Sequence, residues 1–123
     1  MKNQGMNLAW IVAEDFEQTL KFYTEVLGLK LISRTDEYKW AELEGEDGAM
    51  IGVAGKSDES PVMPGQNAVL TYTVENIEEA TSELKEKGVE LIGAIQEVPG
   101  HVKMQLFKDP NGTLGQLVQL LRG

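Results

Sequence analysis

Residues 8–32, LAWIVAEDFEQTLKFYTEVLGLKLI, contain an apolar run, an amphipathic segment, a glycine and a second apolar run in that order. The first run, residues 8–12, has the short apolar composition of a strand. Asp15 stands three residues before Gln18, which is a variant of the capping box that begins a helix. Gly28 is expected to end that helix, and the apolar run after it predicts a second strand.

The same order recurs at residues 68–92, AVLTYTVENIEEATSELKEKGVELI. Asn76 stands three residues before Glu79 and repeats the cap, and Gly88 repeats the stop. The recurrence predicts a duplicated structural unit. Each predicted helix has apolar residues along one face. They are Phe16, Leu20, Tyr23 and Leu27 in the first helix, and Ile77, Ala80 and Leu84 in the second.

Each copy is expected to close with a β-hairpin. Asp-Gly and Asn-Gly pairs favour tight hairpin turns because both residues tolerate positive φ. The predicted hairpins are residues 38–44 and 49–54 around Asp47-Gly48, and residues 101–108 and 113–120 around Asn111-Gly112.

These elements predict an α+β fold of two βαβββ repeats that form curved sheets around a cleft. A helix covers only one face of a sheet, so the other faces must cover each other, a partner chain or a ligand. We expect residues 1–123 to form a single domain. Repeat 1 spans about 6–55, a linker rich in Gly, Ser, Pro and charges spans about 56–66, and repeat 2 spans about 67–121.

Composition narrows the possible partners and the compartment. The 123 residues have a formal net charge of −9, which disfavours a nucleic-acid partner because phosphates are neutralised by Lys and Arg. No apolar stretch reaches the length of roughly 20 residues that spans a bilayer, so we expect no membrane association. The chain has no cysteine, which suits a reducing compartment, and we expect a cytoplasmic protein.

Several short motifs resemble the vicinal oxygen chelate superfamily, which contains glyoxalase I, extradiol dioxygenases, fosfomycin-resistance enzymes and bleomycin-resistance proteins. The resemblance covers nearly the whole chain and implies the paired βαβββ fold and a homodimer. It says little about activity, because members share a scaffold and differ in chemistry. The matching motifs are Glu14-Asp15-Phe16, Phe22-Tyr23, Val26-Leu27-Gly28-Leu29, Val74-Glu75-Asn76, Lys87-Gly88-Val89 and Phe107-Lys108-Asp109-Pro110-Asn111-Gly112.

The resemblance also implies where a metal would be held. In metal-dependent members four side chains from the first and last strands of each repeat bind the ion, and the corresponding positions here are Leu8, Gly52, Val69 and Gln116. Only Gln116 can coordinate an ion, so we expect the metal-free branch and no cofactor. The chain has one histidine, which excludes an iron site of two histidines and a carboxylate. A carboxylate-only site for Mg²⁺ or Ca²⁺ is the alternative.

Strand alternation predicts which residues line the cleft. The predicted lining is apolar and aromatic with few polar groups, which suits a flat or cationic organic ligand. The alternative is that these side chains fill the core between the sheets. The predicted lining residues are Leu8, Trp10, Trp40, Met50, Gly52, Val69, Thr71, Met104 and Gln116.

The leading functional hypothesis is a metal-free protein that binds a small organic ligand, either a drug or a metabolite, and in this it resembles the bleomycin-resistance branch. One alternative is a glyoxalase-like lyase or isomerase, or another enzyme of the superfamily. His101 is then a candidate general base, although a histidine at a strand start is more often a surface residue. The other alternative is a structural or partner-binding module.

Overall fold

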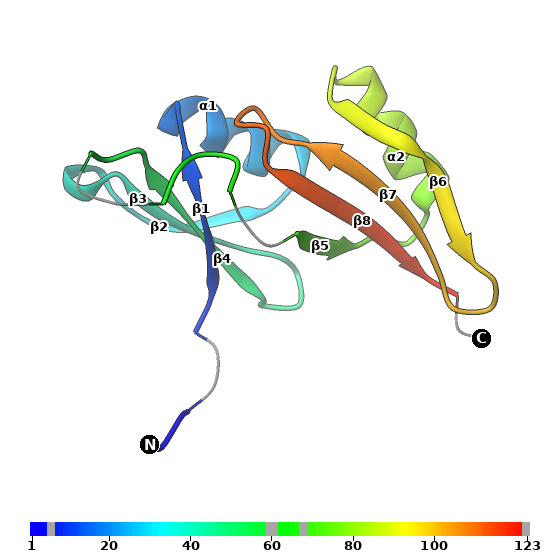
Figure 1. Ribbon diagram of the computed structural model, residues 1–123, viewed down its shortest axis with the longest axis horizontal. Helices are drawn as coiled ribbons and strands as arrows, with labels where there is room; N and C mark the ends of the chain where they lie inside the picture. The colour runs from blue at the N-terminus through cyan, green and yellow to red at the C-terminus, as the bar shows by residue number, and fades with distance from the viewer. Residues whose placement is uncertain (5–6, 59–61, 67–68, 122–123) are drawn as a thin grey trace. The chain divides into compact units, whose positions relative to one another are not determined.

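The computed structural model describes residues 1–4, 7–58, 62–66 and 69–121, and the chain divides into two compact units, Met1–Gln66 and Asn67–Gly123 (Figure 1). Each unit has one four-stranded sheet with a helix against it. The predicted α+β fold of two βαβββ repeats is therefore confirmed, whereas the single domain stays a prediction. No helix in the described ranges is long and apolar enough to cross a membrane.

In the first unit the sheet order is β1-β4-β3-β2, with β1 parallel to β4 and the other pairs antiparallel. A parallel pair needs a crossover between its strands, and the helix with β2 and β3 supplies it. The elements are β1 (Ala9–Ala13), α1 (Phe16–Lys21), the π-helix η1 (Phe22–Val26), β2 (Lys30–Thr35), the 3₁₀ turn η2 (Asp36–Tyr38), β3 (Trp40–Glu44) and β4 (Met50–Gly55).

The second unit repeats this topology, with sheet order β5-β8-β7-β6 and β5 parallel to β8. In Figure 1 the helix α2 lies against its own sheet, beside β6. The elements are β5 (Leu70–Thr73), α2 (Ile77–Glu86), β6 (Glu90–Val98), β7 (Val102–Lys108) and β8 (Leu114–Leu120).

Both predicted helix caps are confirmed. The Asp15 side chain accepts a hydrogen bond from the Gln18 backbone N–H at 3.0 Å, and Asn76 accepts one from the Glu79 N–H at 3.0 Å. Each contact satisfies a backbone donor that has no partner within its helix.

The first helix differs from its prediction in its last turn. It widens into the π-helix η1, in which the Leu27 N–H donates to the Phe22 carbonyl five residues earlier, at 3.1 Å. This extra residue per turn is a local change that periodicity does not reveal. Gly28 and Gly88 then take positive φ values of 75° and 78°, as the predicted stops require.

Two predicted strands begin later than expected. Tyr38 belongs to η2, and Lys39 has a left-handed backbone (φ 49°), so β3 begins at Trp40. His101 lies in the turn before β7, where its N–H donates to the Val98 carbonyl at 2.9 Å. In both places a turn conformation interrupts the extended backbone.

The first strand of each unit also begins later than predicted. The parallel ladders begin at the pairs Ala9–Ile51 and Leu70–Gly115, so Leu8 and Val69 precede their strands. Ala68, predicted as a strand residue, lies outside the described residues.

Alternation along the strands separates two faces in the first sheet. The face beneath α1 and η1 is the core, whose side chains are buried. The core residues of this unit include Ile11, Ala13, Leu20, Phe22, Tyr23, Ala41, Leu43, Ile51 and Val53.

Candidate functional site

The other face of the first sheet, here called the second face, carries the aromatic residues predicted for binding. The register aligns three rows across β1, β4 and β3, and neighbouring strands place their side chains side by side. The rows are Trp10–Gly52–Glu42, Val12–Ala54–Trp40 and Met50–Glu44.

Gly52 makes room for the indole of Trp40. A Cβ atom built on Gly52 would lie 2.2 Å from Trp40 Cη2 and 3.1 Å from Trp10 Cβ. Both distances are shorter than ordinary van der Waals contact, so only glycine allows the Trp40 ring to lie this close to the strand. The ring centroids of Trp10 and Trp40 are then 6.3 Å apart with an interplanar angle of 65°, an edge-to-face contact.

Glu42 is a functional candidate that the sequence prediction missed. Its carboxylate accepts a hydrogen bond from Trp40 Nε1 at 3.0 Å. Alternation from Trp40 along β3 places Glu42 on the second face, so the sequence did contain the signal. The interaction fixes the orientation of the indole and places a negative charge beside it.

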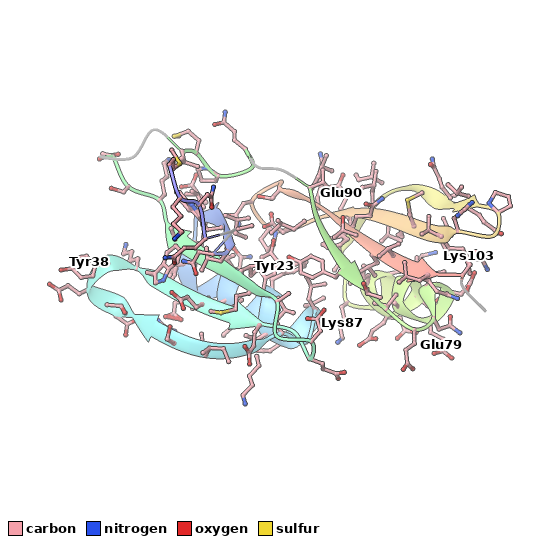
Figure 2. All side chains as sticks on the ribbon, turned by 90° about the horizontal axis from the view of Figure 1, so that it is seen from below. Tyr23, Tyr38, Glu79, Lys87, Glu90 and Lys103 are labelled. Carbon is pink, nitrogen blue, oxygen red and sulfur yellow. The ribbon has the colours of Figure 1, made fainter. Side chains whose placement is uncertain are left out.

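A cavity of about 260 Å³ opens beside the two tryptophans. Its wall includes a third aromatic residue, Tyr38, whose side chain is exposed and lies at the tip of the β2–β3 hairpin (Figure 2). The lining residues are Trp10, Val12, Tyr38, Trp40, Ala54, Gly55, Ser57 and Val62.

The predicted lining residues of the first unit thus divide into two groups. Trp10 and Trp40 lie at the cavity, and Gly52 lies beneath Trp40. Met50 is on the same face but not in the cavity wall, and Leu8 precedes β1 and is half-buried.

In the second unit the structure joins two of the predicted residues. Thr71 on β5 is opposite Gln116 on β8, and the Thr71 hydroxyl donates to Gln116 Oε1 at 3.1 Å. Met104 on β7 is opposite Val118 of β8, and Val69 precedes β5 with its side chain exposed. The pair of Thr71 and Gln116 occupies the position that corresponds to Trp10 and Gly52 in the first unit. The two units therefore present different side chains at equivalent positions.

The residues at the four positions where the resemblance implies metal ligands are not suited to coordinate a metal ion. The space above Gly52 is filled by the Trp40 ring, and the Gln116 carbonyl oxygen already accepts a hydrogen bond from Thr71. Leu8 and Val69 offer no donor atom. Within the described part of the chain, no three His, Asp or Glu side chains gather closely enough to hold an ion.

The ion pairs with shifted pKa values lie between strands and helices rather than at the cavity. A hydrogen bond from Arg34 of β2 lowers the pKa of Glu17 on α1. A hydrogen bond of 3.0 Å from Lys103 of β7 likewise lowers the pKa of Glu78 on α2. These exposed pairs tie each helix to its sheet and contribute little to stability.

His101 is exposed in the β6–β7 turn. Its role as a general base stays a prediction.

Comparison with known proteins defines the class to which this fold belongs. The sequence profile of the Glyoxalase/Bleomycin resistance protein/Dioxygenase superfamily matches residues 5–117. The chain belongs to this superfamily. No curated protein sequence matches it significantly.

Solved structures support the same fold. An integron cassette protein from the mobile metagenome of the Halifax Harbour sewage outfall aligns with a TM-score of 0.78 and 22% identity, over 96% of this chain and 100% of that one. A superfamily member from Sphaerobacter thermophilus gives a TM-score of 0.79 and 20% identity, over 95% of this chain and 99% of that one.

A genomically encoded fosfomycin resistance protein from Listeria monocytogenes gives a TM-score of 0.77 and 17% identity, over 96% of this chain and 94% of that one. At these identities the likeness shows the fold, and the chemistry must be argued from the site.

Proposed function

We propose that this protein binds a small organic cation on the second face of its first sheet and does so without a metal ion. The observation that carries the proposal is the cavity beside the edge-to-face pair of Trp10 and Trp40, in which Trp40 also donates to Glu42. Aromatic rings supply apolar area and attract cations through their negative faces.

The charge of the site supports a cation over a neutral ligand. Glu42 places a carboxylate next to the Trp40 ring, and the whole chain has a net charge of −9. An indole N–H that donates to a carboxylate is polarised, which increases electron density over the ring. Because Trp10 remains 40% exposed, a ligand can reach the ring from solvent.

The proposal predicts that organic cations raise the melting temperature and change tryptophan fluorescence. Trp10 and Trp40 are the two tryptophans of the chain, so the intrinsic emission reports on this cavity alone. A panel should contain organic cations together with neutral and anionic compounds of similar size. If no cation changes either signal at millimolar concentration, the proposal fails.

Glu42→Gln supplies the decisive variant, because the amide oxygen still accepts the Trp40 hydrogen bond while the charge is lost. We expect cation affinity to fall about fivefold, which corresponds to about 1 kcal/mol for a partly solvated charge. Glu25→Gln is the matched control, since Glu25 lies in η1 on the helix side of the sheet. A fivefold loss in both variants would show a general charge effect instead.

The remaining sequence predictions belong to this proposal. We propose that the two units act as one domain in a cytoplasmic homodimer without a nucleic-acid partner. Light scattering coupled to size-exclusion chromatography tests the dimer, and a monomeric mass of 13.6 kDa would contradict it.

A further inference from the structure

The three aromatic side chains at the cavity do not form a slot. Trp10 and Trp40 meet at 65° with centroids 6.3 Å apart, so their planes form a corner. A flat ligand sandwiched between two rings needs parallel planes about 7 Å apart, which is twice the contact distance of carbon atoms. The pair therefore cannot hold a planar ring between its faces.

A corner suits a rounded cation. Tyr38 adds a third aromatic wall from η2, a different element from β1 and β3, which carry the tryptophans. Lys39 fixes this placement: its left-handed backbone (φ 49°) turns the chain between Tyr38 and Trp40, so that both reach one cavity. A lysine in the left-handed backbone conformation is strained, and residues with strained backbones concentrate at binding sites.

We infer that Trp10, Tyr38 and Trp40 form an aromatic box for a compact N-methylated ammonium group. This inference rests on the proposed function and narrows its ligand from organic cations in general to one shape. Cation–π attraction is the physical basis, since a methylated ammonium has little hydration to lose and offers its charge in every direction. Glu42 strengthens the box through its hydrogen bond to Trp40 Nε1.

The test uses the two indole N–H signals in a ¹⁵N-correlated NMR spectrum of the full chain. Three probes are titrated: choline, its neutral isostere 3,3-dimethyl-1-butanol, and the planar cation N-methylquinolinium. We expect choline to shift both indole signals and to bind about tenfold more tightly than either of the others.

Tyr38 variants test the third wall. The side chain is 74% exposed, so its replacement should not disturb folding. Tyr38→Leu should weaken choline binding about threefold and leave the neutral isostere unchanged, whereas Tyr38→Phe should bind choline as the wild type does.

The outcomes separate the two proposals. If N-methylquinolinium binds and choline does not, the box is wrong while the proposed function stands. If neither cation shifts the indole signals, both fail. If the neutral isostere binds as well as choline, the cavity is merely apolar and the box is again wrong.

Discussion

Replacing Gly52 by alanine tests whether the Trp40 ring really occupies the second face. The added Cβ would lie 2.2 Å from Trp40 Cη2 and 2.6 Å from Cζ2, and ordinary contact begins at 3.4 Å. The ring must therefore swing away from the sheet. The chain then loses the contact between Trp10 and Trp40, which contributes about 1 kcal/mol, and retains overpacking of about 1 kcal/mol.

We expect Gly52→Ala to lower the free energy of unfolding by about 2 kcal/mol and to shift the tryptophan emission to longer wavelength. Gly115→Ala is an informative comparison, because its Cβ would lie 2.4 Å from Phe107 Cζ and Phe107 is fully buried. Since Phe107 cannot swing into solvent, this variant should lose about 3 kcal/mol. Gly45 is the control, since its Cβ would meet nothing closer than 3.6 Å.

Urea denaturation followed by circular dichroism and fluorescence measures all three variants. Gly45→Ala should remain within about 0.5 kcal/mol of the wild type. The reasoning is refuted if Gly52→Ala is as stable as Gly45→Ala, or if its native emission matches that of the wild type. Either result would mean that the Trp40 ring does not lie on Gly52.

Three further predictions concern stability and ionisation. Asp109→Ala should lower the free energy of unfolding of the second unit, measured by urea denaturation, by about 2–3 kcal/mol. The buried Asp109 carboxylate accepts hydrogen bonds from the backbone N–H groups of Asn111 and Thr113, which hold the β7–β8 turn. A loss below about 0.5 kcal/mol would contradict this role. Lys39→Gly should stabilise the chain by about 0.5 kcal/mol, since relief of the left-handed strain exceeds the entropy of glycine, and a lower melting temperature would argue against it. The pKa of Glu17, measured by NMR, should lie below the ordinary value of a glutamate in the wild type and closer to that value in Arg34→Gln. The pair with Arg34 stabilises the fold above the unfolded-state pKa of Glu17, and this stabilisation disappears as the pH falls through the lowered pKa. Equal Glu17 midpoints in the two proteins would refute the assignment of that shift to Arg34.

Much of the fold could be predicted because local signals agree with one another. The Asp15 and Asn76 caps, the glycine stops and the repeated order of elements each predict the same βαβββ unit, and the structure confirms it. The start of β3 was misplaced because the backbone conformation there departs from what the residue type favours. Lys39 is a left-handed lysine, and no sequence rule places one there.

The site was predictable only in part. Trp10, Trp40 and Gly52 were all predicted to line the cleft, but nothing in the sequence indicates that the Trp40 ring lies over Gly52. Ring positions depend on side-chain torsions, which periodicity does not specify. Tyr38 was assigned to a strand and its contribution to the cavity was missed, because the turn at η2 is what brings it there.

The most direct test of the account is a crystal structure of the full chain grown with choline and, separately, with Zn²⁺ and Ni²⁺. The account predicts electron density for the ammonium group against Trp10, Tyr38 and Trp40, with Glu42 still bonded to the Trp40 indole, and no metal ion held by side chains on the second face. A metal ion coordinated there by protein atoms, with the aromatic cavity empty of choline, would contradict it.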